Sequence, residues 1–235
     1  MLNRKGTNFI RFILDELFPP ILRDNYYFMY PLFFIWFKGK NVKRFMEFKS
    51  NFHKLSEEEF ANYYKDYDYI SNRKTDLNSK SIRFIIDHLD ENKDIRIADI
   101  GCGDGYVLHH LQKHGFNNII GVDIAQKSAY ENIEIINGNI EHLPFQDNSF
   151  DVVICNHTLE HVMNLEKAVQ ELKRIAKKKL IITIPRQKYY KYTFDLHLHF
   201  FPQISYLLKI IDLPEEQLHY KNIQGDWSIV SYLNQ

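Results

Sequence analysis

The sequence predicts an α/β fold: a doubly wound, mostly parallel seven-stranded sheet with one antiparallel edge strand, plus an N-terminal helical cap. Two observations carry this prediction. Downstream of about residue 75, short β-rich runs alternate with helical stretches, which is typical of parallel strands joined by crossover helices. Upstream, the segments are aromatic and helix-like. We therefore expect a helical, aromatic-rich segment at residues 1–74 and a sheet domain at residues 75–235.

The upstream part is predicted to hold three helices, at about 7–17, 31–49 and 57–66. The third helix follows Ser56, and Glu59 comes three residues later. This spacing is a capping box, in which the two residues satisfy each other's backbone N–H groups at the start of a helix.

The downstream part begins with a helix over about 77–90, in which Ile82, Ile85 and Leu89 mark one apolar face. The elements expected after it are, in order, strand 95–100, helix 105–114, strand 118–122, a short turn or helix near 126–130, strands 133–137 and 151–155, helix 162–177, strand 180–184, helix 204–211, and strands 217–223 and 228–233. The last two strands have no helix between them, so we expect a hairpin at one edge.

Composition and charge exclude several classes of protein. Thirty basic side chains balance thirty acidic ones, so no global field favours nucleic acid. Residues 1–55 nevertheless carry ten basic and four acidic side chains, which suits a phosphorylated substrate, an acidic partner or a membrane surface. Only Cys102 and Cys155 occur, so we expect no disulfide framework, a reducing compartment and a cytoplasmic protein.

The most hydrophobic stretch is Tyr26–Phe37, with eight aromatic residues in twelve. A membrane-spanning helix needs about 20 apolar residues, and Pro31 is expected to break this one. The acidic residues at 15–16 likewise argue against a secretory signal. We favour a packed cap or homodimer surface; a peripheral membrane contact through residues 26–44, helped by their four cationic side chains, stays open.

A glycine loop, Asp99-Ile100-Gly101-Cys102-Gly103-Asp104-Gly105, lies between a predicted strand and a helix. A dinucleotide loop of the G-x-G-x-x-G type would need its third glycine at Tyr106. The acid at the strand end, Asp99, would repel a pyrophosphate but suits a cationic ligand. Asp123 ends the next strand, at the distance where an acid takes ribose hydroxyls.

The chain here resembles the class I S-adenosylmethionine-dependent methyltransferases, which are Rossmann-like. ADIGCGDG is similar to their first motif, GVDIA to their second, and NGNIEHLPFQDNSFDVVICNHTLEHV to a segment usually written G-D-A-x-x-L-P-F-x-D-x-S-F-D. The resemblance covers about residues 80–185. It implies S-adenosylmethionine as cofactor and the following cofactor-binding residues: Asp99, Gly101, Cys102 and Gly103 at the methionine end, Asp123 at the ribose, Ile124 at the adenine face, Asn139 in place of the usual acid, and also Ile140 and Asn156. From its position before the first core helix, we also expect Arg73 to reach the cofactor carboxylate.

His157-Thr158-Leu159-Glu160-His161 matches the zinc-hydrolase pattern H-x-x-E-H, but that pattern belongs within a helix and His157 directly follows a strand. Some related methyltransferases, including ubiquinone-pathway O-methyltransferases and small-RNA 3′-end methyltransferases, place metal ligands here as E-x-x-E-H. This chain keeps Glu160 and His161, with His197 and His199 as further candidates. The plain alternative is that the segment starts a helix, and we assign no metal ligand.

A hydroxyl acceptor benefits from a general base with a pKa near neutrality, so histidine is the natural candidate. We rank His161 first, then His199 and His157. The basic and aromatic residues at 186–192 suit an anionic or sugar group, or form a solvated loop.

The predicted function is methyl transfer from S-adenosylmethionine to a hydroxyl of a small molecule or glycan. A diffuse resemblance to bacterial surface-polysaccharide methyltransferases supports a glycan, and residues 1–74 would then cover the substrate. Two alternatives stay open. One is a metal-assisted RNA 2′-O-methyltransferase, and the other is a non-catalytic cofactor-binding module that docks a partner through residues 26–37.

Overall fold

The structure, a computed structural model, describes residues 13, 17–65, 75–89, 91–125 and 128–233. The chain forms two compact units. One contains residues 1–72 together with 188–200, and the other contains residues 73–187 together with 201–235. We call them the helical unit and the sheet unit. Most of the helix expected at 7–17, and the predicted cofactor residue Arg73, lie outside the described residues.

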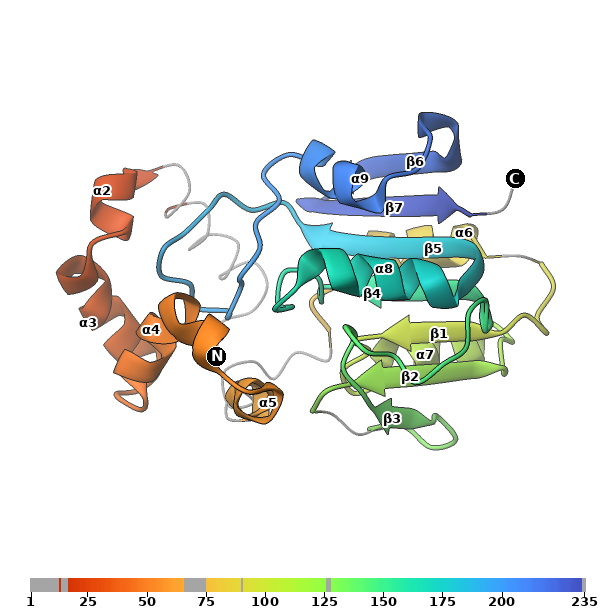
Figure 1. Ribbon diagram of the computed structural model, residues 1–235, viewed down its shortest axis with the longest axis horizontal. Helices are drawn as coiled ribbons and strands as arrows, with labels where there is room; N and C mark the ends of the chain where they lie inside the picture. Colours follow the sequence, from red (N-terminus) through yellow and green to blue (C-terminus); the bar gives the residue numbers. More distant parts are fainter. Residues whose placement is uncertain (1–12, 14–16, 66–74, 90, 126–127, 234–235) are drawn as a thin grey trace. The chain divides into compact units, whose positions relative to one another are not determined.

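The sheet unit contains one seven-stranded sheet in the order β3-β2-β1-β4-β5-β7-β6 (Figure 1). Its strands are β1 (Ile97–Ile100), β2 (Ile119–Asp123), β3 (Ile135–Asn137), β4 (Phe150–Asn156), β5 (Ala176–Pro185), β6 (Leu218–Ile223) and β7 (Asp226–Tyr232). Strands β1 to β5 pair in parallel, whereas β7 is antiparallel to both β5 and β6. The predicted fold class is confirmed. The antiparallel strand of the predicted hairpin is β7, which lies next to the edge strand β6.

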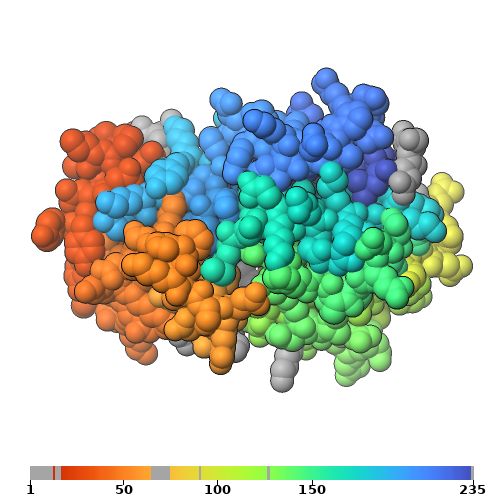
Figure 2. All heavy atoms as spheres, in the orientation of Figure 1, coloured from red at the N-terminus to blue at the C-terminus, as the bar shows by residue number. Residues whose placement is uncertain are grey.

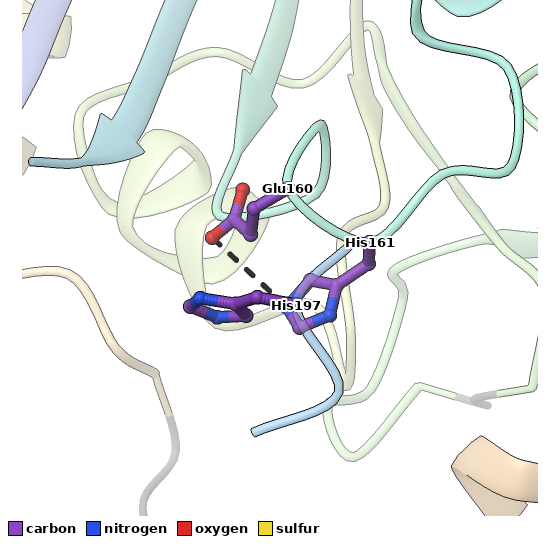
Figure 3. Close-up of side chains that lie close together, drawn as sticks. All are labelled: Glu160, His161 and His197. Carbon is purple, nitrogen blue, oxygen red and sulfur yellow. Dashed lines mark ion pairs between the residues drawn. The ribbon is translucent and has the colours of Figure 1, made fainter. Parts of the chain in front are cut away.

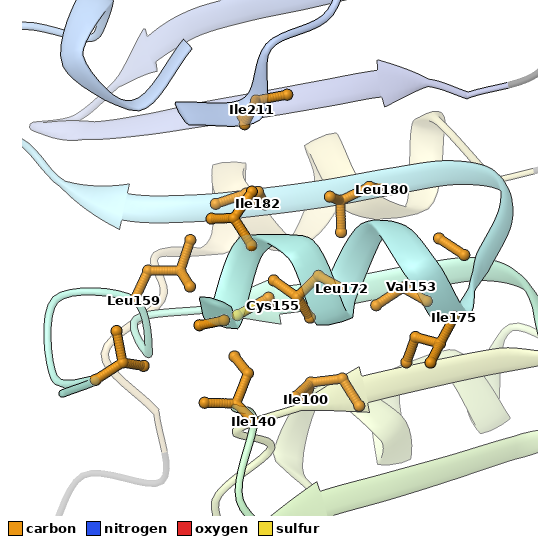
Figure 4. Packing of buried hydrophobic residues seen from close by; sticks show 14 of the residues in the cluster. Ile100, Ile140, Val153, Cys155, Leu159, Leu172, Ile175, Leu180, Ile182 and Ile211 are labelled. Carbon is orange, nitrogen blue, oxygen red and sulfur yellow. The ribbon is translucent and has the colours of Figure 1, made fainter. Parts of the chain in front are cut away.

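Helices cover both faces of the sheet. On one face lie α6 (Ser79–Asp87) and α7 (Tyr106–Lys113), and on the other lie α8 (Leu165–Ile175) and α9 (Ser205–Ile211); a short 3₁₀ turn, η3 (Glu215–Gln217), precedes β6 (Figure 1). Alternate residues of each strand point to opposite faces. Ile100, Val153 and Ile182 therefore pack beneath α8 (Figure 4), while Ile97, Ile154 and Ile181 pack against α6 and α7.

Strand β5 begins at Ala176, four residues earlier than the predicted start at 180, so the predicted helix 162–177 was too long. The reason is the lysine run that opens the strand. Lys177 and Lys178 are exposed, and Lys178 lies 3.1 Å from Oδ1 of Asp151 on the preceding strand. Lysines carry little β-propensity, so a pattern based on apolar residues misses a strand end that is held by pairing and by an ion pair.

The helical unit contains α2 (Pro20–Arg23), α3 (Tyr26–Trp36), α4 (Val42–Asn51), a 3₁₀ turn η2 (Phe52–Lys54) and α5 (Glu57–Lys65). The capping box before α5 is confirmed. The backbone N–H of Ser56 donates to Oε2 of Glu59 (2.8 Å), and the backbone N–H of Glu59 donates to Oγ of Ser56 (3.2 Å).

Two details of the predicted helix at 31–49 were wrong. The region forms two helices, because Lys38, Gly39 and Asn41 adopt positive φ angles and end the helical path. Pro31 lies inside α3 and does not break it. A proline inside a helix lacks an N–H donor and crowds the preceding turn. Here the Asn25 side chain caps α3 by accepting from the N–H of Phe28, and the buried Met29 and Phe33 hold the helix on both sides of the proline.

Segment 188–200 belongs to the helical unit through aromatic packing. Phe194 stacks on Phe33 with ring centroids 4.4 Å apart, and Tyr192 meets Tyr26 at 6.1 Å. The ammonium of Lys49 lies 3.6 Å from the ring centroid of Tyr189 and donates to the backbone carbonyl of Tyr190. The predicted domain boundary at 74/75 is adjacent to residues outside the described part, and the substrate-covering role of residues 1–74 stays a prediction.

Neither unit contains a membrane-spanning element within its described residues, since none of the helices there has the length and apolar character needed to cross a bilayer. Both cysteines are buried and free.

Candidate active site at the carboxyl edge of the sheet

The predicted site residues of the sheet unit converge because strands β1, β2 and β4 are parallel neighbours in register. Asp99 pairs with Gly121 of β2 and with Ile154 of β4. The loops that follow these strands therefore leave the same edge of the sheet. This edge is where ligands bind in doubly wound folds.

The glycine loop adopts left-handed backbone angles, with φ of +74° at Gly101, +57° at Gly103 and +88° at Gly105. The first two glycines differ in their surroundings. A Cβ atom at Gly101 would lie 2.1 Å from Oγ1 of Thr158, whereas a Cβ atom at Gly103 would meet nothing within 4 Å. Gly101 is therefore required for packing against the loop after β4, and Gly103 leaves room for a ligand at the backbone.

Asp123 fastens the glycine loop to the end of β2. Its Oδ2 accepts from the backbone N–H of Gly103 and its Oδ1 from that of Ala125, both at 2.9 Å. The carboxylate is partly exposed. A carboxylate oxygen can accept more than one hydrogen bond, so this side chain can also accept from ribose hydroxyls while it holds the loop.

Asp99 is buried at the end of β1, and its Oδ1 has no hydrogen-bond partner among the described residues. Burial, assisted by the negative charge of Asp123, raises the pKa of Asp99 to about 7. A buried carboxyl group without a partner costs free energy, and a cationic ligand would both pair with it and favour its ionised form.

Asn156, the last residue of β4, repeats this pattern. Both polar atoms of its side-chain amide are buried and lack a hydrogen-bond partner in the described part of the chain. Asn156 lies two residues after Ile154, the register partner of Asp99, so the two side chains point to the same face of the sheet. Two unsatisfied buried polar groups beside an open glycine backbone fit a polar, positively charged ligand such as the methionine end of S-adenosylmethionine.

The remaining predicted cofactor residues have other partners as well. Asn139 already accepts a 2.9 Å hydrogen bond from the N–H of Glu141 through Oδ1, which leaves one lone pair for an adenine amino group. Ile140 packs in the core beneath α8 (Figure 4), and Ile124 is partly exposed after β2. The Cys102 side chain packs closely on Gly121, where a Cβ atom would lie 2.6 Å from Sγ.

His157 follows β4 with a positive φ of +49° and lies between two acids. Its Nδ1 is 3.3 Å from Oε1 of Glu160, and its Nε2 is 3.6 Å from Oδ2 of Asp226. Burial alone would lower the pKa of His157, but the two carboxylates outweigh it and raise this pKa to about 10. His157, whose side chain is only 16% exposed, is therefore a cation that joins the loop after β4 to the start of β7.

This ion cluster reaches α6 through Asn78, whose Nδ2 donates to Oδ2 of Asp226 at 3.2 Å. Asn78 also caps α6 by accepting from the N–H groups of Lys80 and Ser81. Sequence reasoning missed Asp226 and Asn78. The capping sequence Asn78-Ser79-Lys80-Ser81 was a usable signal for the helix start, but Asp226 lies too far along the chain for any local pattern to connect it with His157.

Glu160 and His161 come from the loop after β4 (Figure 3), with Nε2 of His161 4.0 Å from Oε1 of Glu160. Glu160 is fully buried, whereas the His161 side chain is 25% exposed. His161 thus has a neighbouring carboxylate and is more exposed than His157, whose side chain is 16% exposed. His197 and His199 lie in segment 188–200 and belong to the helical unit.

A family model described as a methyltransferase domain matches residues 98–183, which run from β1 to β5 and include the glycine loop, Asp123 and the loop after β4. The sheet unit contains a class I methyltransferase domain over these residues. S-adenosylmethionine is the cofactor of this class, and the unpaired atoms of Asp99 and Asn156 in this methyltransferase domain fit it.

The chain is also similar to two curated proteins. An uncharacterized protein of Methanocaldococcus jannaschii is 36% identical over 143 residues, which cover 59% of this chain and 60% of that protein. A ubiquinone biosynthesis O-methyltransferase of Rickettsia bellii is 33% identical over 129 residues, which cover 48% of this chain and 53% of that enzyme. The chain thus spans less than two thirds of the length of these relatives.

The methyltransferase fold is also found among solved structures. A complex from Haloferax volcanii, which contains a methyltransferase activator, matches with a TM-score of 0.55 at 13% sequence identity, covering 66% of this chain and 89% of that one. At this identity the likeness concerns the fold alone.

Proposed function

We propose that the protein transfers the methyl group of S-adenosylmethionine to a hydroxyl group of a small molecule or glycan. The observation that carries the proposal is the buried Oδ1 of Asp99, which lacks a hydrogen-bond partner in the described part of the chain, at the end of the strand that leads into the open backbone of Gly103. These groups suit a ligand that is positively charged and approaches the loop closely. The Rickettsia relative, named as an O-methyltransferase, supports oxygen as the acceptor atom.

Bound S-adenosylmethionine supplies a methyl group that is already activated on a sulfonium, so the protein mainly orients the reactants and removes a proton. In this proposal Asp99 and the backbone at 101–103 hold the methionine end, and Asn156 offers a donor and an acceptor to it. Asp123 accepts from the ribose hydroxyls, while Asn139 accepts from the adenine amino group and Ile124 covers the adenine ring.

His161 is the proposed base, since its side chain is partly exposed and Glu160 would stabilise the imidazolium that forms when it accepts the hydroxyl proton. His199 is the second candidate. His157, although predicted as a third, is held as a cation between Glu160 and Asp226 and lacks the lone pair that a base needs. It is better suited to positioning the loop that carries His161.

The decisive experiment is a calorimetric titration of the full chain with S-adenosylhomocysteine, with NADH as the control ligand. We expect micromolar binding to the first ligand and none to the second. A preference for NADH, or no binding to either, would overturn the proposal.

Turnover is then measured with labelled S-adenosylmethionine and a panel of hydroxyl acceptors, with and without a chelator. Methyl transfer that survives the chelator supports the proposed reaction. Activity on RNA that is lost in chelator and restored by metal would instead favour the metal-assisted RNA methyltransferase. Cofactor binding with no turnover on any acceptor would favour a non-catalytic module.

A further inference from the structure

Helix α3 has an outward face that is entirely apolar. Tyr27 is 86% exposed, Ile35 is 75% exposed and Phe34 is 51% exposed, and Tyr30 is exposed between them. These positions recur at helical spacing and lie on one side of the helix. A helix of a water-facing surface would carry polar residues there.

The opposite face of α3 already accounts for the packing of the helical unit. Met29 and Phe33 are buried, and Phe33 stacks on Phe194. The helix therefore carries apolar and aromatic side chains around its whole circumference. Burial in the core of the helical unit accounts for those on one side only. Ile21 and Leu22 of α2 are exposed too, at 80% and 40%. We call Ile21, Leu22, Tyr27, Tyr30, Phe34 and Ile35 the apolar face; residues 20–37 are coloured red to orange in Figure 2.

A set of positive charges follows the apolar face directly. Lys38, Lys40 and Lys43 are exposed, and the sequence contains no acidic residue from Tyr26 to Met46. The nearest acid along α4, Glu47, lies 3.9 Å from the ammonium of Lys43, whose side chain is 76% exposed. An apolar, tyrosine-containing face beside exposed lysines matches the layers of an anionic lipid surface, in which acyl chains lie beneath negatively charged headgroups.

We propose that the helical unit binds the surface of an anionic lipid bilayer, with α3 lying in the plane of the interface. The eleven residues of α3 are too few to span a bilayer, which takes about 20, so the contact is peripheral. Tyr27 and Tyr30 would place their hydroxyl groups at headgroup level, and Phe34 and Ile35 would enter the acyl boundary. This inference goes beyond the proposed reaction and does not depend on it.

Charge decides between a bilayer and a second copy of the chain. In a two-fold dimer built on α3, the same patch of each chain meets the other, so two sets of lysines would border the interface with no acid on the 26–46 segment to offset them. An anionic surface offsets them directly.

Vesicle flotation of the full chain tests the proposal, using phosphatidylcholine vesicles and vesicles in which phosphatidylglycerol replaces part of the phosphatidylcholine. We expect binding to the anionic vesicles that weakens with added salt, and little binding to the neutral ones. Tyr27→Gln with Ile35→Gln should weaken binding about tenfold for each side chain. Lys38→Glu with Lys40→Glu should weaken it about fivefold or more for each lysine.

Matched controls lie on the sheet unit. Tyr206→Gln replaces an exposed aromatic residue of another helix, and Lys113→Glu with Lys209→Glu reverses two exposed lysines elsewhere; all three changes should leave vesicle binding within about twofold of wild type. Circular dichroism and S-adenosylhomocysteine binding show whether each variant is folded. Equal binding to both kinds of vesicle, or binding unchanged by Tyr27→Gln with Ile35→Gln, would overturn the proposal. A wild-type dimer that these two changes convert to a monomer would assign the apolar face to a second copy instead.

Discussion

Oδ2 of Asp123, at the end of β2, accepts a 2.9 Å hydrogen bond from the backbone N–H of Gly103, in the glycine loop that follows β1. One carboxylate thus holds the glycine loop and, in the proposed function, also accepts hydrogen bonds from the ribose hydroxyls. Variants at this position must separate these two effects.

Asp123→Ala should weaken S-adenosylhomocysteine binding by about 1–3 kcal/mol, because it removes charged acceptors both from the ribose and from the loop. Asp123→Asn keeps one oxygen acceptor and should lose less. Isothermal titration of the three proteins measures the difference. Affinity of Asp123→Ala equal to that of wild type would show that the ribose is held elsewhere.

Alanine substitutions at two glycines can separate the cost of a left-handed backbone conformation from the effect of filling the proposed ligand site. Gly103 and Gly225 both have positive φ, and a Cβ atom at either would meet nothing within 4 Å. Alanine at each should therefore cost about 1 kcal/mol of folding stability, the usual penalty for a left-handed residue with a Cβ atom. Only Gly103→Ala should also reduce cofactor affinity, since the new methyl group occupies the proposed binding space. Equal cofactor affinity in the two variants would place the ligand away from the loop.

Gly101→Ala is expected to fail for a different reason. The new Cβ atom would lie 2.1 Å from Oγ1 of Thr158, so the loop after β4 must move. We expect a loss of several kcal/mol of stability, seen as a lower urea midpoint than that of Gly103→Ala. Similar urea midpoints for the two variants would mean that the Thr158 side chain can move away from the new Cβ atom at little cost in stability.

Asp99 should make stability and cofactor affinity respond to pH in opposite directions. Its pKa of about 7 in the folded protein exceeds the ordinary value of 3.8, so the folded chain holds this proton more tightly than the unfolded chain. By linkage, the contribution of Asp99 to stability falls as pH rises from about 4 to about 7. A cationic ligand prefers the ionised carboxylate, so affinity should rise over pH 6 to 8.

Asp99→Asn tests both halves of this expectation. Without ligand, the variant should gain thermal stability relative to wild type at pH 8 but not at pH 4, as measured by thermal denaturation. Its affinity for S-adenosylhomocysteine should be lower and lack the rise between pH 6 and 8. A wild-type affinity that is flat over this range would contradict the proposed pairing of Asp99 with the cationic end of the cofactor.

Removing the cation at His157 should leave the buried carboxylates of Glu160 and Asp226 without the positive charge that lies between them. His157→Gln should therefore destabilise the protein by about 3–5 kcal/mol near pH 6. Because the pKa of His157 is raised to about 10, its contribution is complete below its ordinary pKa of 6.5 and is lost as pH rises through 10. The deficit of the variant should thus shrink at pH 10, as denaturation in urea would show. His114→Gln, at an exposed histidine, is the control and should behave like wild type at both pH values.

His161→Ala should reduce turnover about 10²-fold or more, the typical contribution of a general base, while cofactor affinity changes less than about twofold. His199→Ala is measured beside it as the second candidate. Loss of turnover in His199→Ala alone would move the role of base to that residue, and unchanged turnover in both would remove the histidines from the proton transfer.

The sequence predicted much of the sheet unit because its signals are local. Strand–helix alternation predicted the succession of strands along the chain and their mostly parallel direction, and Ser56 with Glu59 predicted the start of α5. The break between α3 and α4 escaped because Lys38 and Asn41 adopt left-handed angles that their residue types permit but do not require. The early start of β5 was not predicted because the first residues of this strand are mostly lysines.

The candidate site was predicted in part for the same reason. Asp99 and Asp123 stand in recognisable motifs, whereas the restraint on His157 comes from Asp226, and the restraint on Gly101 comes from Thr158. Such contacts depend on strand register and tertiary packing, so they cannot be predicted from a periodic pattern in the sequence. The same holds for the membership of 188–200 in the helical unit.

Segment 188–200 has a consequence for how the protein is made. The ribosome releases α2 to α5 first, yet the partners Tyr190, Tyr192 and Phe194 are synthesised about 120 residues later, after the strand β5. Until then the aromatic side chains of the early helices have no native neighbours from that segment. The helical unit can therefore complete its packing only after strand β5 and segment 188–200 have been synthesised.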